Sequence, residues 1–374
     1  MDQLTCCRES SLTDEEKAVF ASDLAKRGLC RDVWDLFGEW VIRSTPNVCF
    51  FYLKVRKDAE LVGLGLLVRI RPLDLRTSYA PLRRNASLSK VAAVLSAASR
   101  TCIYVSFRNL ITSNLTRPFF FRATELEDDV MTAILRWLKD QRDADLISIV
   151  DTTTQDDVFA REGFASYPSS SEAYLDATRY GDVSEYLAEH RSLKKNLARR
   201  RTRVTTEVAW GPVSADDREQ LLACVECSAG LSNVNNPCQR FFEDNIASTE
   251  VFTSDKYLHI RIRVDGRIAG FHVFQVCGSQ MGGVLGGFDR EHTRSNFVYE
   301  RVIVASLDYA IKEGLDRIHY SLVDNLTKLR LVESLEPCRL YVYASGALNR
   351  KMFALTYKHS DMYSLFLLER GGAA

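Results

Sequence analysis

A run of basic residues with helical spacing is the feature of this sequence that most directly suggests a binding function. The segment 191–203 holds seven Lys or Arg side chains and no acid. Four of them recur every four residues, so on a helix they line one side: Arg191, Lys195, Arg199 and Arg203. Like charges at this spacing repel one another, so helix stability does not explain the pattern. Contact with phosphates does explain it, whether they belong to a pantetheine, a nucleotide or a tRNA. A solvated linker helix is the alternative.

Four other residues have the chemistry of zinc ligands, but their arrangement does not favour a metal site. They are Cys224, Cys227, Cys238 and His259. The first two lie inside a helical pattern, and no second pair with matching spacing follows. We therefore predict reduced thiols and no metal. The sequence also contains no Walker loop, nucleophile elbow or HExxH motif.

The composition is that of a globular protein with two domains. The chain has 374 residues, of which 46% are hydrophobic, and its 49 basic and 49 acidic residues cancel. A chain of zero net charge is not a polycation made to coat nucleic acid. Acids near the N-terminus argue against a secretory signal, and no stretch approaches the ~20 apolar residues that span a bilayer. We expect a soluble, cytoplasmic protein, without membrane insertion, whose ten cysteines are reduced.

The first half of the sequence predicts helices, a hairpin and then alternating helices and strands. Helices are expected at 11–28 and 32–42, hairpin strands at 48–55 and 61–70, a basic loop at 72–89, a strand at 102–107, a helix at 125–140, and strands at 146–150 and 173–175. A helix that ends at Gly163 separates the last two strands.

A similar order begins again after residue 203. The pattern predicts a strand at 204–210, helices at 215–229 and 237–247, a meander over 257–264, 267–276 and 280–287, a helix at 296–312, a strand at 317–321, a helix at 325–332, a strand at 339–344 and a tail at 352–368. We interpret this as one mixed α/β architecture used twice, a mostly antiparallel sheet flanked by helices. The predicted parts are an N-terminal domain (1–180), a basic junction helix (181–203) and a C-terminal domain (204–374); one sheet with long insertions is the alternative.

Three segments make the sequence similar to a known family. The run EYLAEHRSLKKNLARR at 185–200 resembles the junction between two domains in one branch of the GNAT superfamily. That branch holds Fem-type aminoacyl transferases, peptidoglycan-biosynthesis acyltransferases and related N-acyltransferases. The segment 159–164 resembles the end of the branch's first domain, and in 299–328 the residues Ala310, Gly314 and Lys328 fall on its pattern. The resemblance covers about residues 159–332.

One departure from the acetyl-CoA members of the superfamily affects the donor. Their phosphate loop is rich in glycine, and its backbone N–H groups at a helix N-terminus hold the pyrophosphate. The matching segment here, 289–296, contains no glycine. Fem-type members also lack this loop and take aminoacyl groups from tRNA.

The resemblance implies a site in the C-terminal domain, at the fourth strand of its sheet. Gly286 and Gly287 would let the substrate approach backbone amides that polarise the acyl carbonyl. Asp289 would orient the acceptor amine or take its proton, or would only cap a turn. Lys328 would hold a phosphate or stabilise the carbonyl oxygen. The remaining candidates are His319 as a catalytic residue, and His272, Tyr299 and Asp324 in the cleft; a core role is the alternative for His272.

The sequence therefore predicts an N-acyltransferase that works by direct attack of an amine on an activated acyl carbon. The donor is expected to be acyl-CoA, an acyl-carrier protein or, as the alternative, an aminoacyl-tRNA, with no permanently bound cofactor. The acceptor is a small-molecule or peptide amine. A GNAT-like binding protein without catalytic activity is the second alternative. Strand pairing is expected to bring Asp289, His319 and Lys328 into one cleft.

Overall fold

The computed structural model describes most of the chain. The described residues are 4–28, 31–45, 48–70, 102–106, 118–141, 144–151, 156–169, 171–199, 203–232, 251–322, 326–332, 334–346, 350, 351 and 354. Several predictions fall outside them: the loop at 72–89, the helix at 237–247, Cys238, Asp324 and all of the tail at 352–368 except residue 354.

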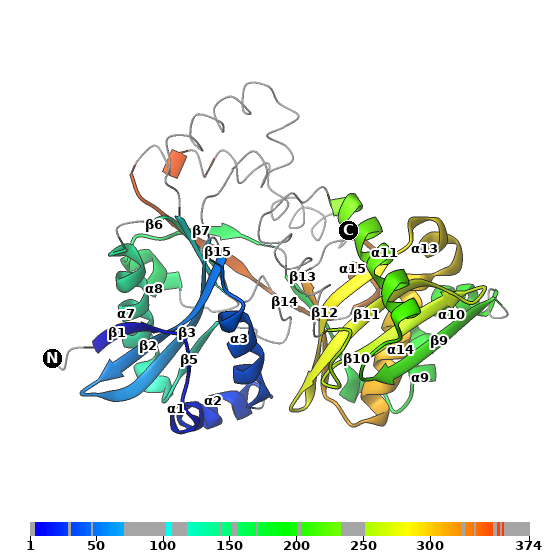
Figure 1. Ribbon diagram of the computed structural model, residues 1–374, viewed down its shortest axis with the longest axis horizontal. Coiled ribbons are helices and arrows are strands. Elements are labelled where there is room, and N and C mark those ends of the chain that lie inside the picture. Colours follow the sequence, from blue (N-terminus) through cyan, green and yellow to red (C-terminus); the bar gives the residue numbers. More distant parts are fainter. Residues whose placement is uncertain are drawn as a thin grey trace.

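Two β-sheets lie side by side, each flanked by helices (Figure 1). The first sheet contains β1 (Leu4–Glu9), β2 (Val48–Lys57), β3 (Glu60–Ile70), β4 (Cys102–Ser106), β5 (Phe119–Phe121), β6 (Ala144–Asp151), β7 (Ala165–Pro168) and β15 (Arg339–Ala344). Its order is β1-β2-β3-β4-β6-β15-β7, with β5 paired to β3. The predicted hairpin is confirmed as β2 and β3. Strand β1 was not predicted, because its sequence LTCCRE lacks the alternation of apolar and polar residues.

Helices cover both faces of this sheet. The capping box that starts α1 (Asp14–Val19) is formed by Thr13 and Glu16. It is followed by α2 (Ala21–Lys26) and α3 (Asp32–Ile42), and the later helices are α7 (Glu127–Lys139) and α8 (Asp156–Arg161). Helix α7 buries the apolar stripe that its sequence predicts, and it packs on the side of the sheet away from α3 (Figure 1).

The second sheet has the order β14-β8-β13-β12-β11-β10-β9. Its strands are β8 (Glu172–Asp176), β9 (Val204–Trp210), β10 (Leu258–Val264), β11 (Arg267–Cys277), β12 (Gln280–Phe288), β13 (Arg317–Leu322) and β14 (Ser334–Glu336). Its helices are α9 (Val183–Glu189), α10 (Arg191–Arg199), α11 (Ala215–Ser232), α13 (Arg290–Asn296), α14 (Val298–Lys312) and α15 (Leu326–Leu331). The helix predicted at 296–312 is confirmed as α14. The short helix α13 that precedes it was not predicted, and Phe297, whose φ of 55° is left-handed, separates the two.

The two sheets repeat one design. Each begins with an edge strand, continues through an antiparallel hairpin, and then makes one parallel pair, β4 with β6 in the first sheet and β12 with β13 in the second. A helix connects each parallel pair, α7 in the first sheet and α14 in the second. The predicted duplication of a mixed α/β architecture is confirmed.

Strand membership does not follow the predicted boundaries at residues 180 and 204. Strand β8, from the first half of the sequence, lies in the second sheet between β13 and β14. Strand β15, from the second half, lies in the first sheet between β6 and β7. Each half therefore gives one strand to the other. Sequence patterns predicted both strands but not their partners, because strand pairing is set by contacts far apart in the chain.

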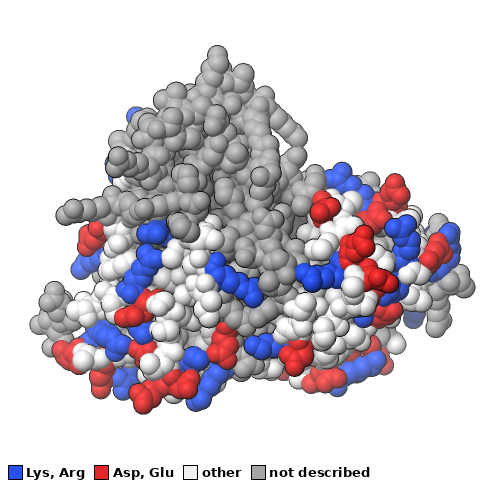
Figure 2. Space-filling view, in the orientation of Figure 1, with Lys and Arg blue, Asp and Glu red and all other residues white. Residues whose placement is uncertain are grey.

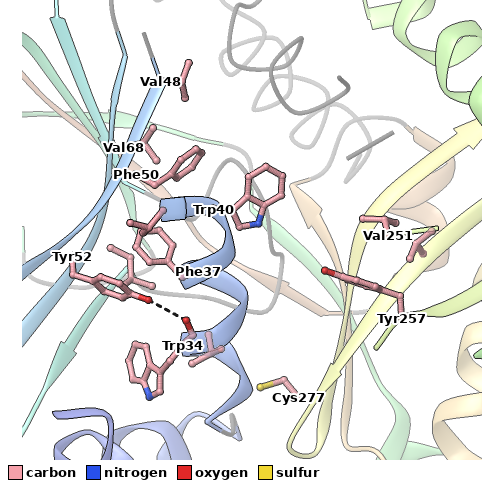
Figure 3. Packing of buried hydrophobic residues seen from close by; sticks show 14 of the residues in the cluster. Trp34, Phe37, Trp40, Val48, Phe50, Tyr52, Val68, Val251, Tyr257 and Cys277 are labelled. Atoms are coloured by element: carbon pink, nitrogen blue, oxygen red, sulfur yellow. Dashed lines mark hydrogen bonds between the residues drawn. The ribbon is translucent and has the colours of Figure 1, made fainter. Parts of the chain in front are cut away.

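A hydrophobic cluster continues from one half into the other (Figure 3). On the first side, α3 contributes Trp34, Phe37 and Trp40, and the Tyr52 hydroxyl donates to the Trp34 carbonyl at 3.0 Å. On the second side, Tyr257 and Cys277 belong to the same cluster. Burial of large aromatic side chains on both sides stabilises a fixed arrangement of the two sheets.

Charges of both signs are mixed on the described part of the surface in Figure 2, as the zero net charge predicts. Within the part of the chain that the structure describes, no helix combines the length and the apolar character needed to cross a bilayer.

The strand exchange predicts that the halves do not fold separately. Fragments 1–203 and 204–374 should each be aggregated or unfolded alone, because each exposes an unpaired sheet edge, and they should form a 1:1 complex when co-expressed. Size-exclusion chromatography and circular dichroism would measure this. As a control, fragment 204–333, which lacks β14 and β15, should fail to capture the first fragment. Cooperative unfolding of either fragment alone would contradict the prediction.

Candidate functional site

Strands β12 and β13 run together for three residues and then separate. The paired positions are Gln280 with Arg317, Met281 with Ile318, and Gly282 with His319. Strand β12 continues to Phe288, and β11 is its one partner there among the strands that the structure describes. Residues 280–282 are buried, whereas residues 283–286 are partly accessible. We call residues 283–286 the β12 recess, because backbone becomes accessible where the neighbouring strand departs.

The glycines of β12 are needed at their positions for two different structural reasons. A Cβ on Gly287 would lie 2.7 Å from the Val225 backbone nitrogen, so this glycine lets α11 pack directly on the strand. A Cβ on Gly283 would lie 2.4 Å from His272 Nε2, so that glycine makes room for an imidazole. The nearest atoms to a Cβ on Gly286 are at 3.4–3.6 Å, an ordinary contact distance. The predicted role of paired glycines in substrate access therefore concerns Gly286, while Gly287 has a packing role.

Lys328 lies at the point where the strands separate. Its side chain comes from α15 and is buried, and Nζ donates to the Tyr320 carbonyl at 2.7 Å. Tyr320 is the first residue of β13 beyond the last pair with β12. The ammonium thus binds a carbonyl next to the end of the shared ladder. A buried ammonium requires such acceptors, because its transfer from water without them is very unfavourable.

His272 lies beside this lysine. It is opposite Gly286 in the ladder, and its ring stacks on Phe274 with centroids 4.6 Å apart. Burial, with the charge of Lys328 as the second cause, lowers the pKa of His272 to about 3. The imidazole is therefore neutral at physiological pH.

His319 lies on the other face of the sheet. Its neighbours in β13, Ile318 and Tyr320, pack in the cluster with α14, so His319 points toward the first half of the molecule. Its Nε2 is 3.0 Å from Gln280 Oε1, and Gln280 Nε2 donates to the Arg27 carbonyl at the end of α2. Its Nδ1 is 3.4 Å from a carboxylate oxygen of Glu172. His319 thus joins the two halves and does not face the β12 recess.

Asp289 is the N-cap of α13 and accepts a hydrogen bond from the Glu291 backbone at 2.9 Å. It lies seven residues beyond Gly282, roughly 20 Å along the strand from the last pair with β13. Tyr299 is at the same end of β12, where its ring packs on Phe288 with centroids 5.3 Å apart. The prediction that Asp289, His319 and Lys328 converge is therefore wrong. The structure instead brings together Lys328 and His272.

The basic junction segment forms α10. Arg191, Lys195 and Arg199 are exposed, and none of them forms an ion pair with a described residue. Arg203 differs, because it forms a bidentate ion pair with Asp265. Arg301 of α14 donates to the carbonyls of Leu197 and Asn296, which holds the end of α10 beside the junction of α13 and α14. Three of the four basic residues that the sequence singled out are therefore free cations of α10, and phosphate binding by them stays a prediction.

Gln280, Gly283 and Glu172 are residues of this region that sequence reasoning did not single out. A signal was present for Gly283, since β12 contains four glycines in nine residues. No local signal marks Gln280 or Glu172, because their partners lie 39 or more residues away in the sequence.

The two neighbouring glycines give a matched test. Gly287→Ala should destabilise the protein by about 1–3 kcal/mol, because backbone of α11 must move away from the new methyl group. Gly286→Ala should cost clearly less, since its Cβ has room. Urea unfolding of both variants would compare the free energies of unfolding. Equal losses would contradict the packing role of Gly287.

No family model matches the sequence, and no curated protein matches it. Solved structures do match. The C-terminal domain of a putative lysylphosphatidylglycerol synthetase from Agrobacterium fabrum has a TM-score of 0.54 at 13% identity, over 92% of this chain and 97% of that chain. A tandem GNAT protein from the clavulanic acid biosynthesis pathway has a TM-score of 0.53 at 12% identity, over 92% and 99%. FemX has a TM-score of 0.51 at 10% identity, over 83% and 90%. The predicted resemblance is confirmed at the level of the fold, which is that of the tandem GNAT proteins.

Proposed function

We propose that this protein is an acyltransferase that moves an acyl group from an activated donor to an amine at the β12 recess. One observation carries the proposal. Two parallel strands separate after three residue pairs, and a buried ammonium lies beside the accessible backbone that they leave. Such an opening offers hydrogen-bond donors and positive charge to a carbonyl oxygen that becomes negative during acyl transfer.

The chemistry that we propose is direct transfer. The amine nitrogen attacks the acyl carbon, the carbonyl oxygen takes up the electron pair, and the bond to the leaving thiolate or ribose oxygen then breaks. Thioesters and aminoacyl esters already have good leaving groups, so positioning can supply much of the acceleration. In this proposal Lys328 stabilises the negative oxygen, and no covalent enzyme intermediate is needed.

Two classes of donor fit, and different observations favour each. The fold is shared with a tandem GNAT protein whose structure was determined without AcCoA, and this likeness supports an acyl thioester of coenzyme A or of a carrier protein. The absence of glycine in 289–296 and the free cations of α10 favour the second class, an aminoacyl-tRNA. Likeness in fold to a putative lysylphosphatidylglycerol synthetase and to FemX agrees with that class. Seven of the cysteines that the structure describes are free thiols, and this supports the cytoplasm as the compartment where we propose the protein acts.

Removing the Lys328 charge tests the site. Lys328→Met should lower kcat/KM by roughly 10²–10³, because it removes a donor to the developing oxyanion. The assay follows transfer of a radiolabelled group from acetyl-CoA, from a long-chain acyl-CoA or from a pool of aminoacyl-tRNAs to a panel of amines. Lys312→Met is the matched control, since Lys312 is exposed and pairs with Asp308. Thermal unfolding of both variants would show whether Lys328→Met is folded. Absence of transfer from every donor by the wild type would reject the proposed function.

The free cations of α10 give an independent test of donor binding. Combined replacement of Arg191, Lys195 and Arg199 by Ala should weaken binding of the donor's phosphates about tenfold or more at low salt and flatten its salt dependence. Coenzyme A and deacylated tRNA are the two probes, so the one affected identifies the donor class.

A control variant removes the same charge from cations that already pair with acids. It replaces Arg179, Arg203 and Lys312, whose partners are Glu189, Asp265 and Asp308. Equal effects of the two triple variants would mean that only net charge matters, and α10 would then be a linker.

A further inference from the structure

The His272 imidazole lies across β12 at the point where β13 departs. Its Nε2 is 2.4 Å from the position that a Cβ of Gly283 would occupy, and its Cδ2 and Cγ are 3.6 Å from that of Gly286. The ring therefore covers two glycines of the β12 recess and extends from β11 toward the opening. His272 as a whole residue is partly accessible, although its ring is surrounded closely enough for burial to be the main cause of its lowered pKa.

The hydrogen bonding of this ring points to one tautomer. Nδ1 is buried and has no hydrogen-bond partner among the described residues. A buried N–H group without an acceptor is rarer than a buried acceptor without a donor. The proton therefore belongs on Nε2, the nitrogen above Gly283, and the lone pair on Nδ1.

Burial, and after it the charge of Lys328, keeps the ring in this neutral form. Among the described residues, Lys328 is the charged group whose field acts on His272, and its ammonium disfavours a second positive charge beside it. The neighbours in the ladder, Ile260 and Gly286, carry no titratable side chain. A ring with so low a proton affinity is a poor general base at neutral pH, but its N–H remains a hydrogen-bond donor.

We propose that His272 donates its Nε2 hydrogen to the carbonyl oxygen of the acyl group in the β12 recess and is not the base that deprotonates the amine. This proposal rests on the proposed function and assigns a group within it. The oxygen gains negative charge as the amine nitrogen bonds to the acyl carbon, and it returns the electron pair when the bond to sulfur or ribose oxygen breaks. The amine proton passes through water to the leaving group, so His272 neither gains nor loses a proton over the reaction. A neutral imidazole and an ammonium then act on the same oxygen.

The first experiment needs no substrate. In protein labelled with ¹⁵N-histidine, NMR would follow the six histidines between pH 4.5 and 8, with His272 identified by the signal lost in His272→Gln. We expect His272 to stay neutral over this range with its proton on Nε2. In Lys328→Met its pKa should rise, because one of the two causes of its depression is gone. Lys312→Met should leave it unchanged. A wild-type His272 that titrates near its usual pKa of about 6.5, or one that carries its proton on Nδ1, would overturn the proposal.

The second experiment separates a donor from a base. A Gln side chain at position 272 can still offer N–H groups but cannot accept a proton, so His272→Gln should keep kcat within about tenfold of the wild type. His272→Ala should lose roughly 10²–10³ in kcat with little change in KM. The probes are acetyl-CoA and lysyl-tRNA, whichever supports transfer by the wild type. Gly283→Ala, whose methyl group displaces the ring, should behave like His272→Ala, and the exposed control Lys312→Met should not.

The outcomes distinguish the two levels of the proposal. If His272→Gln and His272→Ala lose activity equally, and the wild-type rate falls as His272 is protonated, then His272 is a general base. That outcome would overturn the donor role but leave the proposed acyltransferase activity intact. Absence of transfer from both probes would reject the acyl-transfer role of His272, even where NMR finds a neutral ring.

Discussion

A two-stranded ribbon that crosses between the sheets is the constraint on which the rest of the structure depends. Strands β7 and β8 form one side of it and β15 and β14 the other. Between the two pairs, the Ser169 backbone donates to the Cys338 carbonyl, so the antiparallel hydrogen bonding continues from one sheet to the next. The polypeptide therefore passes between the halves twice within the same ladder. This geometry, together with the shared aromatic cluster, fixes the place of β13, and β13 forms one side of the recess.

Polar residues around β12 and β13 divide between the two faces of the second sheet. On the face toward the first half, His319 lies against both Gln280 and Glu172, and Gln280 reaches the backbone at the end of α2. On the face toward α14, Lys328 and His272 lie at an accessible strand. Both groups are beside the last rung shared by β12 and β13. The first set of residues can thus hold the last β12–β13 pair in place, while Lys328 and His272 remain available for chemistry. This division explains why two polar sites lie so close together in a buried region.

Local sequence patterns predicted the elements well, and their failures have physical causes. The hairpin of β2 and β3, the Asp265-Gly266 turn and the stripe of α7 depend on neighbours in the chain, which the sequence displays directly. The exchange of β8 and β15 depends on pairing between distant segments, which no local pattern encodes. His319 was placed on the correct strand but the wrong face, because both faces of β13 are buried and alternation gives no direction there. An aspartate can act either as a general base or as a helix N-cap, and the position of Asp289 at the start of α13 favours the N-cap role.

The exchange of strands also has a consequence for how the chain is made. The first sheet lacks β15 until residues 339–344 have left the ribosome, so β6 and β7 must wait without the strand that lies between them. Roughly 170 residues separate β7 from β15, which at about 5–20 residues per second corresponds to a delay of roughly 10–30 seconds. During that interval two strand edges, one of them on the apolar β6, are open to wrong partners. The price of locking the halves together is therefore a vulnerable nascent chain, whose first half cannot be completed until its second half has nearly all been synthesised.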